Sequence, residues 1–181
     1  MPRNLAYDPT KGVLEVDWAL FGELSRSLAL KVAREFDPEI VIGIANAGVV
    51  PGATVAAILD CEFHSMLVTR HVDDTDREMP GIFGAVPRRV LGKRVLVVDE
   101  TCDSGDTLRL VTSAVVNAGA SVVRSAVSFR TGRYEPDFHA IATESMIVLP
   151  WDREILVEGR LVLNPKYSQV FAGDDSPYAE G

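Results

Sequence analysis

The sequence predicts an α/β protein with parallel strands, and two observations predict this class. Residues 40–44 and 95–98 form short apolar runs in which β-branched side chains dominate, as is typical of parallel strands buried on both faces. Each run leads into a loop of small or polar residues and then into a helical pattern. The composition agrees, because 47% of the 181 residues are hydrophobic, which suits a globular α/β core.

The remaining elements follow from the spacing of apolar residues along the chain. Apolar runs predict strands, which are residues 13–16, 40–44, 61–69, 95–98, 121–130 and 141–149. Apolar residues at helical spacing predict helices, which are residues 17–36, 52–59 and 108–118. Asp17 is the expected N-cap of the first helix, Asp37-Pro38 ends it, and Gly119 ends the last one. We expect one domain over residues 1–181, with a disordered tail at residues 173–181.

Charge and cysteine usage limit the class of function. The net charge of −8 speaks against non-specific binding of nucleic acid, which needs a basic surface. The two cysteines, Cys61 and Cys102, form neither a disulfide framework nor a metal-ligand pattern. The N-terminus lacks the apolar region of a signal peptide, and no apolar run reaches membrane-spanning length. These features predict a cytoplasmic protein that binds neither nucleic acid nor membrane.

Residues 95–108 carry the chemistry that the sequence offers. Asp99 and Glu100 close an apolar strand, at the edge where open α/β sheets bind ligands. A loop of hydroxyl, acidic and glycine residues then leads into a helix, whose N-terminal N–H groups suit a phosphate. A sugar phosphate satisfies both features, with its phosphate in the loop and its hydroxyls on the acids. The alternative is an ordinary strand–loop–helix connection in which Asp103 is the helix N-cap.

This stretch closely resembles the phosphoribosyl pyrophosphate (PRPP) signature of the type I phosphoribosyltransferases, an apolar strand and two acids followed by D-[ST]-G-x-T. The resemblance implies a twisted, mainly parallel sheet flanked by helices, with a small hood at residues 150–172. It also implies that residues 70–94 are a flexible flap, whose candidate phosphate contacts are Arg70, His71, Arg77, Arg88 and Arg89. The implied PRPP-binding residues of the signature are Asp99, Glu100, Thr101, Cys102, Asp103, Ser104, Gly105, Asp106 and Thr107. Asp103 is the implied general base or proton relay, and Glu100 lies near a Mg²⁺ ion.

The loop after residues 40–44 resembles the segment with which the family grips pyrophosphate. Purine-type members have the form A-R-G-G-L-V-P, and this chain has A-N-A-G-V-V-P at residues 45–51. The resemblance implies that Asn46, Ala47 and Gly48 contact PRPP. Asn46 replaces a basic residue and Ala47 a glycine, so the loop has lost a positive charge and has gained a Cβ.

The ending Leu149-Pro150-Trp151-Asp152 resembles the base-binding segment of the xanthine–guanine and hypoxanthine–guanine branch of the family. The resemblance implies that Trp151 and Asp152 bind the base, with the indole of Trp151 stacked on the purine. Arg130 stands where the branch more often has a lysine that donates to the exocyclic oxygen of the purine. A cation at that position favours a 6-oxopurine over adenine.

The resemblance implies a Mg²⁺-dependent enzyme that transfers the phosphoribosyl group of PRPP to hypoxanthine, guanine or xanthine in purine salvage. Its partners would be PRPP, a purine base and a nucleoside monophosphate, and a homodimer or homotetramer is expected. Two alternatives stay open. The altered loop at Asn46 and Ala47 is what a non-catalytic PRPP or nucleotide sensor could show, and the acceptor could be another base, such as a pyrimidine or adenine.

Overall fold

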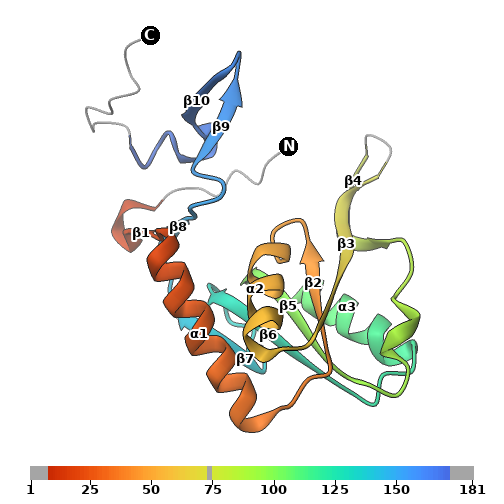
Figure 1. Ribbon diagram of the computed structural model, residues 1–181. Helices are drawn as coiled ribbons and strands as arrows, with labels where there is room; N and C mark the ends of the chain where they lie inside the picture. The colour runs from red at the N-terminus through yellow and green to blue at the C-terminus, as the bar shows by residue number, and fades with distance from the viewer. Residues whose placement is uncertain (1–7, 73–74, 172–181) are drawn as a thin grey trace. The chain divides into compact units, whose positions relative to one another are not determined.

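A computed structural model describes residues 8–72 and 75–171, with the backbone alone between residues 70 and 79. The chain divides into two compact units (Figure 1), of which the larger comprises Gly22–Thr143 and the smaller Met1–Phe21 and Glu144–Gly181. The single domain expected over residues 1–181 stays a prediction. Among the described residues, no helix has the length and apolar character needed to cross a membrane.

A six-stranded sheet forms the centre of the larger unit. Its strands are β2 (Ile40–Ala45), β3 (Glu62–Val72), β4 (Thr75–Phe83), β5 (Arg94–Cys102), β6 (Val122–Arg130) and β7 (Phe138–Ala142). They lie in the order β4-β3-β2-β5-β6-β7, and every neighbouring pair is parallel except β3 and β4. The predicted fold class, a mainly parallel sheet flanked by helices, is confirmed.

Helices cover both faces of this sheet, and the alternation of strand residues decides which face each side chain joins. Ile40, Ile42 and Ile44 pack with Leu108 and Val111 of α3 (Asp106–Asn117). The residues between them point the other way, so Val41 packs with side chains of α1 (Trp18–Glu35) and α2 (Val49–Leu59). Both faces of the central strands are therefore buried, which explains why their sequences are apolar without interruption.

The segment at residues 70–94, predicted as a flexible flap, contains regular structure. β3 extends to Val72, and β4 returns antiparallel to it, so that a β-hairpin occupies much of this segment (Figure 1). Apolar cross-strand pairs, Leu67 with Phe83 and Val68 with Ile82, stabilise the pairing. The sequence did not predict β4 because it contains Pro80 and Gly81, which within sheets occur mainly in edge strands and irregular pairings. β4 is an edge strand here, and its register shifts near Thr69.

Two predicted boundaries were wrong. α2 begins at Val49, not near residue 52. Pro51 falls in the first helical turn, where backbone N–H groups have no acceptor within the helix, so the N–H that proline lacks costs no hydrogen bond. Residues 141–149 are not one strand. β7 ends at Ala142 in the large sheet, and β8 (Met146–Val148) pairs with β1 (Val13–Glu15) in the smaller unit. Composition gave no sign of this change of partner, since both pieces are apolar.

The smaller unit contains two pairs of strands. β1 and β8 are parallel, while β9 (Glu154–Val157) and β10 (Arg160–Leu163) form an antiparallel hairpin whose turn places Glu158 and Gly159 at positive φ. Tyr167 is buried and donates its hydroxyl to Asp152 Oδ1 at 2.7 Å. The predicted disordered tail, residues 173–181, lies outside the described residues.

Candidate functional site

The acidic end of β5 lies within the sheet rather than after it. β5 continues to Cys102, and Asp99 lies opposite Val127 of β6. The side chains of Asp99 and Glu100 are half-buried, and Asp99 Oδ1 accepts a hydrogen bond from the backbone N–H of Glu100 at 2.8 Å. The two predicted ribose-binding acids therefore stand at the carboxyl end of a central strand.

The loop after β5 leads directly into the N-terminus of α3. Gly105 is the residue before the helix, with φ +77°, and it has no side chain with which to cap the helix. The alternative in which Asp103 is the N-cap is therefore wrong. Asp103 and Ser104 are exposed, and Thr107 is half-buried in the first helical turn. The loop thus presents hydroxyl and backbone N–H groups at a helix N-terminus, which is the arrangement that binds phosphate.

The segment after β6, which the sequence did not single out, supports this loop. A Cβ added to Gly132 would lie 2.1 Å from Asp103 Oδ1, so the Asp103 carboxylate rests directly against the backbone of Gly132. The carbonyl of Cys102 accepts hydrogen bonds from the backbone N–H groups of Thr131 and Gly132 at 2.9 and 3.2 Å. The signal that the sequence did contain was Gly132 itself, since a close backbone approach requires glycine.

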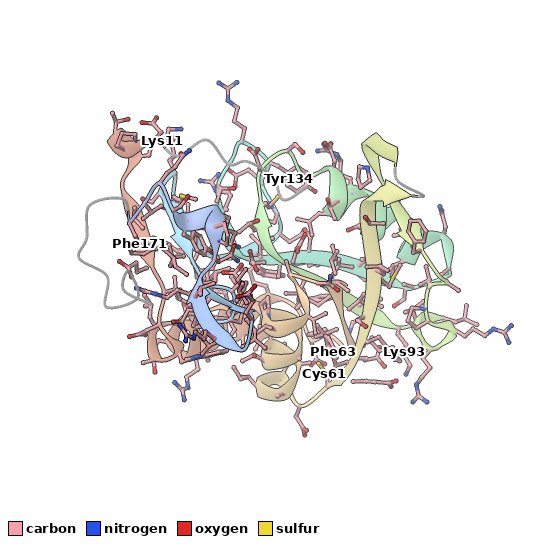
Figure 2. The ribbon with its side chains drawn as sticks, turned by 90° about the horizontal axis from the view of Figure 1, so that it is seen from above. Lys11, Cys61, Phe63, Lys93, Tyr134 and Phe171 are labelled. Carbon is pink, nitrogen blue, oxygen red and sulfur yellow. The ribbon has the colours of Figure 1, made fainter. Side chains whose placement is uncertain are left out.

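Tyr134 is a second contact of the loop that the sequence did not reveal (Figure 2). A Cβ added to Gly105 would lie 2.3 Å from the ring of Tyr134, so the ring packs on the backbone at Gly105. The backbone N–H of Tyr134 donates to the Asp103 carbonyl at 3.3 Å. In Figure 2, Tyr134 lies well apart from Cys61 and Lys93, which directly precede β3 and β5 and so mark the amino ends of these strands.

Cys102 belongs to the core. Its side chain is 3% exposed and packs among apolar residues that include Leu108 and Val111. Burial, followed by the nearby Asp99 carboxylate, raises the pKa of the Cys102 thiol to about 11. The thiol is therefore neutral at physiological pH and packs in the core, so PRPP binding by Cys102 stays a prediction that its side chain does not support.

The β2–α2 loop lies beside the end of β5. A Cβ added to Gly48 would lie 2.6 Å from the Val98 carbonyl oxygen and 2.9 Å from Asp99 Cα. Only glycine fits at this position, and it brings the loop into contact with the acidic strand end. Asn46 and Ala47 are exposed next to this contact. The structure thus brings together the two loops that the sequence predicted to bind PRPP.

Arg130 ends β6, opposite Cys102 of β5 in the register of the sheet. Its Nη1 donates to the Glu135 carboxylate in a short ion pair, and its buried Nε has no partner among the described residues. The side chain is 26% exposed, whereas that of Glu135 is 70% exposed. Glu135 therefore reaches back from the loop after β6 and fixes the guanidinium at the same edge of the sheet as Asp99.

The structure gives little support to the candidate phosphate contacts of the flap. The side chains of Arg70, His71 and Arg77 lie outside the described residues. Arg88 is exposed, and Arg89 forms an ion pair with Glu62, with Nε 2.6 Å from Oε1. Glu62 begins β3, so Arg89 lies at the amino end of that strand. The candidate site lies at the carboxyl ends, so this position does not support Arg89 as a phosphate contact, and that role stays a prediction.

Trp151 and Asp152 lie in the smaller unit. Trp151 is half-buried and packs edge-on against Phe21, with ring centroids 4.9 Å apart and planes at 76°. The Asp152 carboxylate accepts hydrogen bonds from Lys166 Nζ and from the Tyr167 hydroxyl. It thereby ties the turn that carries Trp151 to the segment after β10, and its contact with a base stays a prediction.

The acids at the end of β5 suit a magnesium ion. Among the side chains of residues 8–69 and 80–171, no three His, Cys, Asp or Glu residues form a group that could hold a metal ion by themselves. Asp99 and Glu100 offer hard carboxylate oxygens, which Mg²⁺ prefers, and Mg²⁺ at phosphate sites takes most of its ligands from substrate and water. These two acids therefore fit an ion that arrives with a phosphorylated substrate.

Comparison with known proteins agrees with this geometry. The chain is 24% identical over 162 residues to a xanthine-guanine phosphoribosyltransferase of Nitratidesulfovibrio vulgaris, covering 89% of this chain and 98% of that protein. It is 29% identical over 100 residues to the transcriptional regulator GfcR of Archaeoglobus fulgidus, covering 55% of this chain and 51% of the regulator. The fold matches the crystal structure of a purine phosphoribosyltransferase from Pyrococcus horikoshii with a TM-score of 0.69 and 28% identity, over 81% of this chain and 98% of that one. The phosphoribosyl transferase domain model matches residues 16–160. The chain therefore belongs to the phosphoribosyl transferase domain family.

Proposed function

We propose that this protein transfers the 5-phosphoribosyl group of PRPP to a 6-oxopurine and releases pyrophosphate. The observation that carries the proposal is the meeting of three loops at one edge of the sheet. Gly48 contacts the end of β5 at Asp99, and Gly132 contacts Asp103 in the loop that opens α3. Family membership supports the assignment of this edge as the PRPP site.

The residues at this edge each bind a different part of PRPP. The loop from Ser104 to Thr107 binds the 5′-phosphate through hydroxyl and N–H groups at the start of α3. Asp99 and Glu100 bind the ribose hydroxyls. Asn46, Ala47 and Gly48 face the pyrophosphate, and Asn46 donates to it as a neutral group, which gives weaker bonds than a charged donor.

The reaction breaks the bond between the anomeric carbon and the pyrophosphate oxygen, which leaves with the electron pair. A purine nitrogen donates its electron pair to the anomeric carbon through an oxocarbenium-like state. Asp103 accepts the proton that this nitrogen loses and holds it until solvent takes it. Glu100 would help to hold a Mg²⁺ ion that arrives with PRPP, and such an ion would supply positive charge to the leaving group.

Two residues read the base in this proposal. Arg130, held by Glu135, donates to the exocyclic oxygen of a 6-oxopurine, and it disfavours adenine, whose amino group is a donor at that position. Trp151 stacks on the purine ring, as its resemblance implies. The Asp152 carboxylate, engaged by Lys166 and Tyr167, supports the turn that carries Trp151.

The test is a Mg²⁺-dependent assay of pyrophosphate release from PRPP with hypoxanthine, guanine, xanthine, adenine, uracil and orotate in turn. Turnover with an oxopurine that Asp103→Asn reduces at least about a hundredfold supports the proposal. Asp37→Asn is the matched control, since Asp37 is an exposed acid that pairs with Arg94 at the start of β5. Turnover with adenine or a pyrimidine alone would refute the assignment of the base.

A second function, a PRPP-binding or nucleotide-binding regulator, is favoured by one specific observation. The exposed loop that faces pyrophosphate has Asn46 and Ala47 instead of the basic residue and glycine of purine-type enzymes. The similarity to a transcriptional regulator over 100 residues agrees with this alternative. Binding of PRPP without turnover on any of the six bases would favour it. Asn46→Arg/Ala47→Gly would then be expected to restore pyrophosphate release.

A further inference from the structure

The loop proposed to bind the 5′-phosphate contains an acid that works against this role. Asp106 is the first residue of α3, and its half-buried carboxylate lies where the helix dipole and free N–H groups favour an anion. A carboxylate there stabilises the free helix, yet it repels an incoming phosphate. A phosphate loop with Asp106 in it therefore needs a nearby positive charge.

Arg109 supplies that charge. Its Nη2 donates to Asp106 Oδ1 at 2.7 Å and to the backbone carbonyl of Ser104 at 2.8 Å. The hydroxyl of Ser104 in turn donates to Asp106 Oδ2 at 2.7 Å. One guanidinium thus neutralises the acid three residues before it and at the same time fixes the backbone of the loop at Ser104, five residues before it.

Tyr134 holds the guanidinium from the other side. The guanidinium carbon of Arg109 lies 4.9 Å from the centroid of the Tyr134 ring, in a cation–π contact. The same ring packs against Gly105, where an added Cβ would lie 2.3 Å away. Arg109 and Tyr134 therefore hold the loop between them, and a lysine in place of Arg109 would reproduce the charge but not the planar group that stacks on the Tyr134 ring.

We propose that Arg109 is a positioning residue for the 5′-phosphate, a role that rests on the function proposed above. It cancels the charge of Asp106 and holds the turn from Ser104 to Asp106 in the shape that a phosphate needs. The Ser104 hydroxyl has two competing acceptors when ligand binds, the Asp106 carboxylate and the phosphate. Arg109 satisfies Asp106 and so leaves the hydroxyl available to the phosphate.

The test compares dissociation constants for PRPP with Mg²⁺, by titration calorimetry, across four variants and the wild type. Arg109→Ala is expected to weaken PRPP binding about tenfold, and Asp106→Asn to strengthen it about threefold. The Arg109→Ala change is expected to cost less than about threefold when made in the Asp106→Asn background, because the charge that it neutralised is gone. Arg109→Lys is expected to lie between wild type and Arg109→Ala.

Two comparisons separate positioning from general destabilisation. Inorganic pyrophosphate, which needs only the loop at Asn46, is expected to bind Arg109→Ala within about twofold of wild type. Arg26→Ala breaks another exposed i,i+3 ion pair, that of Arg26 with Glu23 in α1, and is expected to leave PRPP binding unchanged. Equal weakening of PRPP and pyrophosphate by Arg109→Ala, with a lowered melting temperature, would overturn the inference.

The remaining outcomes are also decisive. Wild-type protein that binds no PRPP refutes the proposed function together with this inference. Wild-type protein that binds PRPP, with Arg109→Ala binding it equally well, refutes the inference alone. If Arg109→Ala does not fold, Asp106→Asn still decides, because unchanged or weaker PRPP binding in that variant contradicts the role assigned to Arg109.

Discussion

Gly132→Ala tests whether the segment after β6 sets the position of the Asp103 carboxylate. The added Cβ would lie 2.1 Å from Asp103 Oδ1, 2.5 Å from its carbonyl oxygen and 2.7 Å from its Cα. Two of these three atoms are backbone, so a side-chain rotation does not relieve the clash. The backbone of Gly132 is not at positive φ, so an alanine there is opposed by this contact and not by its own conformation.

The size of the effect follows from these distances. Ordinary van der Waals contact begins at 3.4 Å, so the carboxylate must move about 1.3 Å, and misplacement on this scale costs about a hundredfold in rate. Overpacking of this kind costs about 1–3 kcal/mol of stability, which lowers the melting temperature of a chain of this length by about 2–12 °C. We therefore expect a loss of kcat much larger than the loss of folded protein explains.

The assay is pyrophosphate release from PRPP with the preferred oxopurine, alongside a thermal melt. Gly22→Ala is the matched control, because an added Cβ there meets nothing closer than Arg26 Nη1 at 3.9 Å. Gly22 lies within α1, so alanine is expected to stabilise the helix by up to about 1 kcal/mol without altering kcat. A Gly132→Ala protein with wild-type kcat and melting temperature would refute the reasoning.

Three further predictions concern other parts of the molecule. Because the folded pKa of Cys102 is raised to about 11 from 9.0, the unfolded chain loses this proton first, so the free energy of unfolding should fall as pH rises from 9 to 11. Cys102→Ala should lack this slope in denaturant titrations, and an identical slope would contradict the assignment. Glu135→Gln should raise KM for the base, by about fivefold at most since Glu135 is largely exposed, while KM for PRPP stays constant. An equal rise in both constants would argue against a role in orienting Arg130. Asp152→Ala leaves the buried Tyr167 hydroxyl without this acceptor and should lower stability by about 1–3 kcal/mol in urea titrations, whereas an unchanged midpoint would show that the bond contributes little.

The sequence predicted the central strands and helices well because buried segments consist mainly of apolar residues, and this is visible in the sequence. β2 and residues 95–98 of β5 are buried on both faces, so these stretches consist of apolar residues and one glycine. The signature from Asp99 to Thr107 was also readable, because strand, loop and helix N-terminus are adjacent in the chain. β4 was missed, since Pro80 and Gly81 are typical of irregular structure and the stability of an edge strand comes from its neighbour.

The sequence by itself determined the fold class, the loop that we propose to bind phosphate, and the neutral character of Asn46 in the loop that we propose to face pyrophosphate. These properties depend on residues that are close together in the chain, where spacing and residue type carry the information. Only the tertiary structure decided that Gly132 supports Asp103, that Tyr134 packs on Gly105 and that Glu135 holds Arg130. The first two contacts join the loop after β5 to the loop after β6, and parallel pairing of β5 with β6 creates them. Sequence patterns within one segment do not show which strands pair with each other.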